Sequence, residues 1–250
     1  MEFSAGMLAL ILAVSFGSAI VGGMGGFGTG IMLTATLTPI LGIKAVVPIL
    51  AFAGIIINSG RFWFYRNDFN VEAVKRILPP ALLCLFAGTF IYRELDAARL
   101  AIVIGIVVLM SVPLRRFLQS RQMKIGSKGL IAGGGIFGFL NGIASGMGVV
   151  LVSMLLGAGL TGTAVLATDS LITIVIDVSR SLLFGRYDLL TSQGIMLGAM
   201  IGAASLPGSW IAARLVHRMG AKMHIVVIDV LIIIGGISLL INGVRSLPVV

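Results

Sequence analysis

The chain has 250 residues, of which 58% are hydrophobic and only 11% are charged, and its net charge is +9. Soluble domains carry about 25% charged residues, so the composition excludes a soluble enzyme and a disordered chain, and its long apolar stretches exclude the short alternating strands of an outer-membrane barrel. The basic residues are scattered between apolar segments rather than gathered on one face, which argues against a nucleic-acid partner. We therefore predict an all-α polytopic membrane protein.

The apolar segments can be followed along the chain. Residues 3–43 and 129–168 contain no ionisable side chain, and each stretch is long enough to cross a bilayer about twice, since about 20 apolar residues span the hydrocarbon core. Gly, Pro and clusters of charge divide the chain into ten predicted helices, at 5–23, 28–41, 45–63, 74–92, 99–115, 129–143, 147–160, 163–184, 191–213 and 224–243.

Two of these segments, 28–41 and 147–160, are too short to span a bilayer. Each has about 14 residues and would be roughly 21 Å long as a helix, against a core of about 30 Å. Each follows a Gly-rich break, at 22–28 and at 145–148. We interpret them as the second arms of helical hairpins or of discontinuous helices.

The chain also repeats itself. A shift of 120 residues superimposes the two Gly-rich breaks and places Gly42 on Gly162. The same shift places the Arg-x-Asp motif at 66–68 on that at 186–188. These coincidences indicate two repeats, each a Gly-broken helical hairpin plus three transmembrane helices.

The orientation follows from the basic residues. The loops at 61–76, 114–128 and 214–222 hold twelve of the 18 Lys and Arg residues, so the positive-inside rule makes these loops cytoplasmic and puts both termini outside. The predicted repeats, 1–120 and 121–250, form one integral membrane domain. Each crosses an odd number of times, so they are inverted, as in many secondary transporters. The expected location is the cell inner membrane.

The Gly breaks are the strongest functional signal, because interrupted helices in such transporters expose backbone N–H groups that can bind an anion. The N-termini of the second arms bring the positive ends of two helix dipoles to the centre. The alternative is that Gly22 with Gly26, Gly138 with Gly142 and Gly198 with Gly202 serve close helix packing, an explanation that we favour for Gly198 with Gly202. The predicted substrate-binding residues are Gly25, Gly26, Gly28, Thr29, Asn58, Asn141, Ser145, Gly146, Gly148 and Thr168.

Three acidic residues lie within apolar segments, where a charge is costly and often functional. Asp169 and Asp177 share one face of the 163–184 helix, and we predict that they couple transport to protons, Asp169 first, because removal from water favours the protonated carboxyl group. For Asp177 an alternative is an ion pair with Arg180, and for Asp229 we favour a packing or snorkelling role. The corresponding helix of the first repeat has Asn58 and Arg61 as its polar residues.

No catalytic, metal or cofactor site is predicted. The run at 23–28 fits G-x-G-x-x-G, but no strand precedes it and its surroundings are apolar. The lone Cys84 cannot form a disulfide framework, and His217 and His224 lie among basic residues that indicate an interfacial loop. Asp169 and Asp177 are too far apart on one helix for a protease dyad. We expect a protein that is not an enzyme.

The glycine motifs are similar to those of a known family. The run at 23–28 leads to Gly42-Ile43-Lys44-Ala45, and the run at 142–148 leads to Gly162 and to Ala167-Thr168-Asp169-Ser170. In these motifs, over about residues 8–243, the chain resembles the sulfite exporter TauE/SafE family, also called the TSUP permeases. It departs from the family pattern at Asp169, where a small neutral polar residue is common.

The resemblance implies a secondary transporter of sulfite, sulfonate or a related organic or sulfur anion. The expected partners are this small anion, the lipid bilayer and a proton as co-substrate, and a homodimer is left open. Two alternatives also stay open. An anion channel would show a continuous polar lining, and a non-transporting membrane assembly protein would use its Gly motifs for packing alone.

Overall fold

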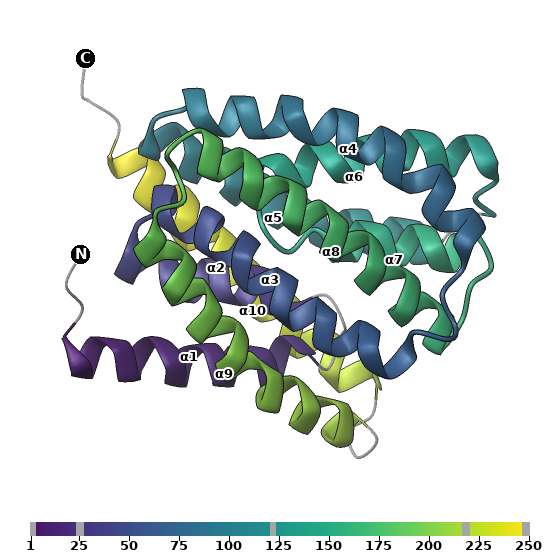
Figure 1. Cartoon of the computed structure of the whole chain (residues 1–250), viewed down its shortest axis with the longest axis horizontal. Helices are drawn as coiled ribbons and strands as arrows, with labels where there is room; N and C mark the ends of the chain where they lie inside the picture. The colour runs from purple at the N-terminus through teal and green to yellow at the C-terminus, as the bar shows by residue number, and fades with distance from the viewer. Residues whose placement is uncertain (1–3, 24–27, 121–123, 217–220, 247–250) are drawn as a thin grey trace.

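The computed structural model describes residues 4–23, 28–120, 124–216 and 221–246. Within these residues the chain forms ten α-helices and no strand (Figure 1). The first five are α1 (Ala5–Gly23), α2 (Gly28–Leu41), α3 (Ile43–Tyr65), α4 (Val71–Glu94) and α5 (Ala97–Ser120). The last five are α6 (Ser127–Ile143), α7 (Gly148–Gly157), α8 (Thr163–Arg186), α9 (Ser192–Val216) and α10 (Ala221–Arg245).

All ten predicted helices are confirmed, and most of them begin or end within a few residues of the expected positions. The two short ones are confirmed as well: α2 has 14 residues and α7 has 10, and the Gly-rich breaks separate them from α1 and α6. The main difference is that α4 and α5 extend further into the loops than predicted. At the start of α4 the Asn70 side chain caps the helix by accepting a hydrogen bond of 2.8 Å from the backbone N–H of Ala73.

The helices pack in a pattern that recurs between the two halves of the chain. α1 lies along α9 and α6 lies along α4, at opposite edges of the bundle, while α3 and α8 pack against each other between them (Figure 1). When the first five helices are exchanged with the last five, α1–α9 becomes α6–α4, α2–α10 becomes α7–α5, and α3–α9 becomes α8–α4. The α3–α8 and α5–α10 contacts map onto themselves.

Glycines make the closest of these contacts. A Cβ atom on Gly142 of α6 would lie 2.6 Å from the backbone nitrogen of Thr89 in α4, and Gly138 packs on Ala81 in the same way. On α9, a Cβ on Gly198 would lie 2.8 Å from the carbonyl oxygen of Ile49, and Gly202 meets α3 one turn further on. The packing interpretation of these two glycine pairs is therefore confirmed.

Gly42 and Gly162, which the sequence repeat superimposes, have the same structural role. Each directly precedes the third helix of its half, and their φ angles are 80° and 57°. Residues other than glycine rarely adopt a positive φ, because their Cβ atom collides with the backbone. The shared glycine thus reflects a shared turn that leads from each short helix into the long central helix.

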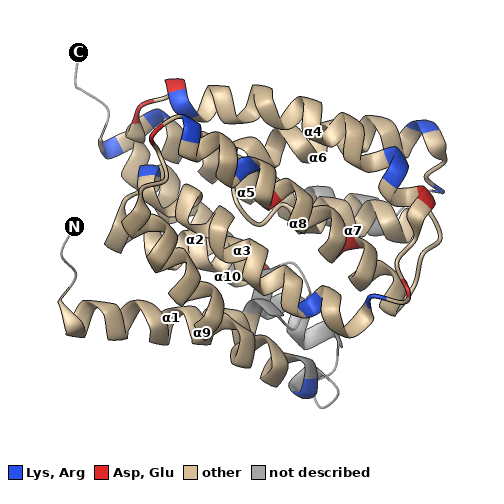
Figure 2. Ribbon diagram, in the orientation of Figure 1, with Lys and Arg blue, Asp and Glu red and all other residues tan. Residues whose placement is uncertain are grey.

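The distribution of charge and hydropathy is that of a membrane protein. Figure 2 shows Lys, Arg, Asp and Glu gathered mainly at the two ends of the bundle, with few along its middle. Among the described residues, three helical segments are long and apolar enough to cross a membrane: Ile43–Tyr65, Val71–Glu94 and Ser192–Ala212. The chain is an all-helical polytopic membrane protein.

Candidate functional site

A cavity of about 70 Å³ lies where the two hairpins meet the central helices α3 and α8. It has room for a few water molecules or one small ion, since a water molecule needs about 10–15 Å³ on this scale. The first turn of α2 lines it with Thr29 and Gly30, and the break before α7 lines it from Ser145 to Gly148. The remaining lining residues are Leu33, Leu50, Gly54, Ile57, Asn58, Arg61, Asn141, Asp169, Thr173, Asp177 and Arg180.

The two hairpins touch each other at this cavity. A Cβ atom on Gly30 of α2 would lie 2.7 Å from the Cα of Gly146, and one on Gly146 would collide with the backbone of Gly30 and Ile31. Gly146 has a φ of 90°, which a larger residue disfavours. The glycines therefore let the first turn of α2 and the break before α7 meet backbone to backbone.

Helix ends contribute backbone polar groups to the site. The first N–H groups of a helix have no partner within the helix, and its N-terminus carries a partial positive charge. α7 begins beside the cavity, and its N-cap residue Met147 makes no side-chain capping hydrogen bond. α2 also begins beside the cavity, so two helix N-termini from different halves of the chain meet at one point.

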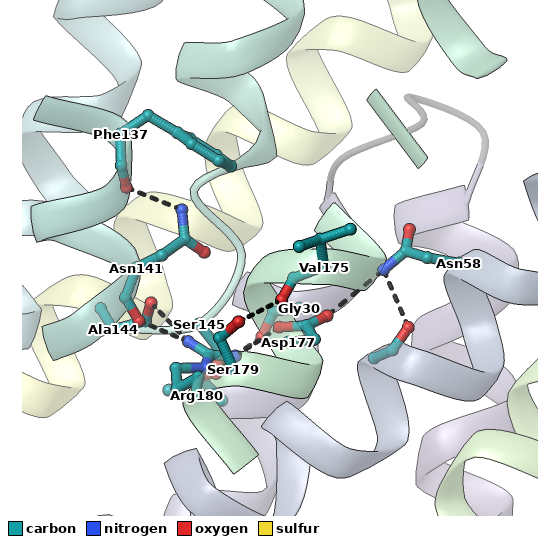
Figure 3. Close-up of polar contacts among 12 residues, drawn as sticks. Gly30, Asn58, Phe137, Asn141, Ala144, Ser145, Val175, Asp177, Ser179 and Arg180 are labelled. Carbon is teal, nitrogen blue, oxygen red and sulfur yellow. Dashed lines mark hydrogen bonds and ion pairs between the residues drawn. The ribbon is translucent and has the colours of Figure 1, made fainter. Parts of the chain in front are cut away.

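Arg180 is the buried cation of the site. Its side chain is 2% exposed. It donates to the carbonyl oxygens of Asn141 at 2.6 Å and Ala144 at 3.2 Å, which lie at the C-terminal end of α6, and to the hydroxyl of Ser145 at 3.3 Å (Figure 3). Because the C-terminal end of a helix carries a partial negative charge, Arg180 caps the first arm of the second hairpin.

Asp177 lies between Arg180 and α3 (Figure 3). One carboxylate oxygen accepts from Arg180 at 2.9 Å, and the other faces the amide of Asn58 at 3.5 Å. Gly54 makes room for this approach, because any Cβ at that position would collide with the Asp177 carboxylate. Both oxygens of Asp177 therefore have a partner.

Asp169 forms the second ion pair of the cavity. Its Oδ2 lies 3.3 Å from a guanidinium nitrogen of Arg61 on α3, whose side chain is 14% exposed. The cavity is therefore lined by two Arg and two Asp side chains, which balance each other in charge. Asp169, Asp177 and Arg180 of α8 are buried, and the pairs with Arg61 and Asn58 join α8 to α3.

Four buried polar atoms of the cavity lining have no hydrogen-bond partner within the protein. They are Oγ1 of Thr29, Oγ1 of Thr173, Oδ1 of Asp169 and Nε of Arg180. Buried polar groups in proteins are almost always hydrogen-bonded, and each exception costs about 1–3 kcal/mol. Four such atoms around one cavity, donors and an acceptor together, are typical of a site whose remaining partners are water molecules or a ligand.

The cavity brings together most of the residues predicted from the sequence. Thr29, Asn58, Asn141, Ser145, Gly146, Gly148, Asp169 and Asp177 all line it. Gly28 begins α2, and Gly25 and Gly26 lie outside the described residues. Thr168 does not line the cavity: its hydroxyl accepts a hydrogen bond of 2.9 Å from the backbone N–H of Asn70 and so fixes the start of α4.

The alternatives weighed for the other acidic residues can also be compared with the structure. The Asp177–Arg180 pair exists, but both groups are buried beside the cavity rather than at an interface. Asp229 of α10 pairs at 2.9 Å with Arg116 of α5, away from the cavity. The sequence analysis gave Arg180 only the role of a partner for Asp177, because no local signal shows that it caps α6. It did not identify Gly54, because the contact between α3 and α8 has no local signal either.

Comparison with known proteins identifies the family of this chain. The chain matches the family described as sulfite exporter TauE/SafE over residues 10–239, which is most of its length. No curated protein and no solved structure gives a match. With a polytopic helical fold and a family match that spans both halves, the chain belongs to the sulfite exporter TauE/SafE family of membrane transporters.

Proposed function

We propose that this protein is a secondary transporter that carries a small anion, such as sulfite or a related sulfur oxyanion, across the cell inner membrane, and that the cavity between the hairpins binds the anion. The family match supports membrane transport of sulfur anions. The observation that carries the assignment to this cavity is the set of four buried polar atoms without a partner around it.

The donors of the cavity suit an oxyanion. The free Nε–H of Arg180 and the hydroxyls of Thr29 and Thr173 can each donate to an anion oxygen. The unpaired N–H groups of a helix N-terminus bind anions for the same reason, and both α2 and α7 begin here. A site of this size excludes bulky organic anions and favours a compact ion.

The balance of charge favours a proton as co-substrate. With two Arg and two Asp the lining is neutral, so an added sulfite dianion would leave two uncompensated negative charges in an apolar bundle, which is costly. A proton that enters with sulfite reduces this excess to one negative charge. Asp169 and Asp177 are the carboxylates that can take part, as the sequence predicted.

The packing exchange between the halves supports two inverted repeats, with α6, α9 and α10 inverted relative to α1, α4 and α5. The 24 residues of α5 are about 36 Å long, so its two ends lie at opposite sides of a membrane. A cysteine at Asp96 should react only with an impermeant reagent added outside, and one at Ile125 only after the cytoplasmic side is opened. Labelling of both from one side would refute the inverted arrangement. Cys84→Ser provides the cysteine-free background.

The transport activity itself is tested by counterflow in proteoliposomes. Purified protein is reconstituted with unlabelled sulfite inside, and uptake of labelled sulfite is measured with no net gradient. A transporter accelerates uptake when sulfite is present on the far side, whereas a channel shows no such acceleration. An assembly protein moves no sulfite at all, so a rate equal to that of empty liposomes would contradict the proposal.

A further inference from the structure

The carboxylates of Asp169 and Asp177 both lie in the same cavity on the same helix, yet only one of them has an oxygen without a partner. Asp177 is satisfied on both oxygens, by Arg180 and by Asn58. Asp169 has Oδ2 on Arg61, while Oδ1 is buried and without a partner among the described residues. Asp169 is 2% exposed, so the missing bond must come from whatever occupies the cavity.

An ionised carboxylate oxygen can only accept hydrogen bonds. In its ion pair with Arg61 the Asp169 carboxylate uses Oδ2 and leaves Oδ1 as an acceptor, and the other charged groups that line the cavity with it are Asp177 and Arg180 of its own helix. A ligand that satisfies Oδ1 must therefore bring a donor. A fully deprotonated anion, or a sulfonate, presents only acceptor oxygens and would face Oδ1 with a repulsive contact.

The other three unsatisfied atoms of the lining require a ligand that accepts hydrogen bonds. Arg180 Nε is a donor, and the hydroxyls of Thr29 and Thr173 can turn to donate. The unsatisfied atoms thus form a pattern of three donors and one acceptor. This pattern is complementary to an oxyanion with several terminal oxygens and one hydroxyl group.

We infer that Asp169 is a specificity-determining residue, which selects oxyanions that carry an O–H group over anions of the same shape that carry none. The inference rests on the proposed function and narrows its substrate class, from any small sulfur anion to a protonated one such as hydrogensulfite in its hydroxyl form. The ligand then brings its own proton, which lies in the hydrogen bond to Asp169 Oδ1.

Matched pairs of probes test this directly. Hydrogensulfite in its hydroxyl form and methanesulfinate differ by a hydroxyl against a methyl group, and phosphate, which is protonated at slightly acid pH, differs from sulfate by the presence of O–H groups on a tetrahedral ion. Isothermal titration of the purified full chain at slightly acid pH should give the wild type about tenfold or greater preference for the hydroxyl-bearing member of each pair, because a site built around a hydrogen bond rejects the analogue that lacks it.

The variant Asp169→Asn converts the acceptor into a donor with little change in shape. Its amide oxygen can still accept from Arg61, while its NH₂ group faces the cavity. The preference within each pair should fall to about one or reverse. Asp229→Asn is the control, since Asp229 is equally buried but lies outside the cavity, and it should keep the wild-type ratio.

The possible results separate this inference from the proposed function. If the wild type binds methanesulfinate as tightly as hydrogensulfite, and sulfate as tightly as phosphate, the selectivity of Asp169 is refuted while anion binding stands. An unchanged ratio in Asp169→Asn refutes it as well. If none of the four probes binds, the proposed function fails and the inference fails with it. Should the variant not fold, the wild-type ratios alone decide.

Discussion

The two halves of this protein repeat each other in packing but differ in chemistry. Each half has a broken hairpin, a positive-φ glycine before its central helix, and helix contacts that exchange with those of the other half. The charged groups of the cavity do not follow this pattern. α8 supplies Asp169, Asp177 and Arg180, whereas α3 supplies Arg61 and the neutral Asn58. The packing that the two halves share therefore forms the cavity, while the second half supplies both of its carboxylates.

The difference in charged groups between the halves should have its largest effect at Arg180. Arg180→Ala removes the buried cation, uncaps the end of α6 and leaves Asp177 without its ion pair. Breaking a buried pair on one side costs about 3–5 kcal/mol of stability, so the Tm should fall. The loss of the guanidinium donor to the anion should reduce sulfite counterflow by about 100-fold, since a hydrogen bond to a charged group contributes up to about 3 kcal/mol. Combining Arg180→Ala with Asp177→Asn removes the stranded charge and should restore thermal stability but not transport. Recovery of transport in the double variant would show that Arg180 has only a structural role.

The shared scaffold is tested next, at the contact between the hairpins. Gly30→Ala would place a methyl group 2.7 Å from the Cα of Gly146. Overpacking of this kind costs about 1–3 kcal/mol, and it displaces both helix starts that line the cavity, so we expect a lower Tm and about tenfold slower counterflow. Gly17→Ala on α1 is the matched control, because nothing lies within 4 Å of its added Cβ. Equal effects of the two changes would mean that the hairpin contact is unimportant.

A third test concerns the acid that has no counterpart in the first half. Asp169→Asn leaves the helix dipoles and Arg180 in place, so the variant should still exchange labelled sulfite across the membrane. Accumulation driven by a pH gradient should be lost, because the anion no longer requires a proton to bind. Full pH-driven accumulation in the variant would refute the role of Asp169 and make Asp177 the next candidate. Proteoliposomes with an imposed pH gradient provide the measurement.

The smallest effect is expected at Asn58, the contribution of α3 to the Asp177 site. Asn58→Ala removes a hydrogen bond to a charged group whose principal partner is Arg180. A loss of about 1 kcal/mol corresponds to about fivefold weaker sulfite binding. Asn242→Ala near the end of α10 serves as the control. A loss as large as that of Arg180→Ala would mean that the two halves contribute equally, contrary to the comparison above.

The order and extent of the helices could be predicted because they depend on local signals. Runs of apolar residues, Gly breaks and capping residues are visible in any short window of the chain. The cavity residues on α8 could be grouped for the same reason, since the helix repeat places Asp169, Thr173 and Asp177 on one face.

The partners of these residues could not be predicted, because they depend on how distant helices pack. Arg61 and Asp169 are 108 residues apart in the sequence, and Asn58 and Asp177 are 119 apart. The direction of the Thr168 side chain could not be predicted either. It adjoins Asp169, but one residue turns a helix by about 100°, so its hydroxyl faces the loop before α4 instead of the cavity.

The contact between Gly30 and Gly146 has a mechanical consequence. Two chain segments that touch backbone to backbone, with no side chain between them, have no flexible layer that could absorb a relative shift. A displacement of one hairpin is therefore passed directly to the start of the other. Since Arg180 ties the end of α6 to α8, the same displacement also reaches the longest helix of the cavity wall. The start of α2 and the break before α7 behave as a single joint, although they belong to different halves of the chain.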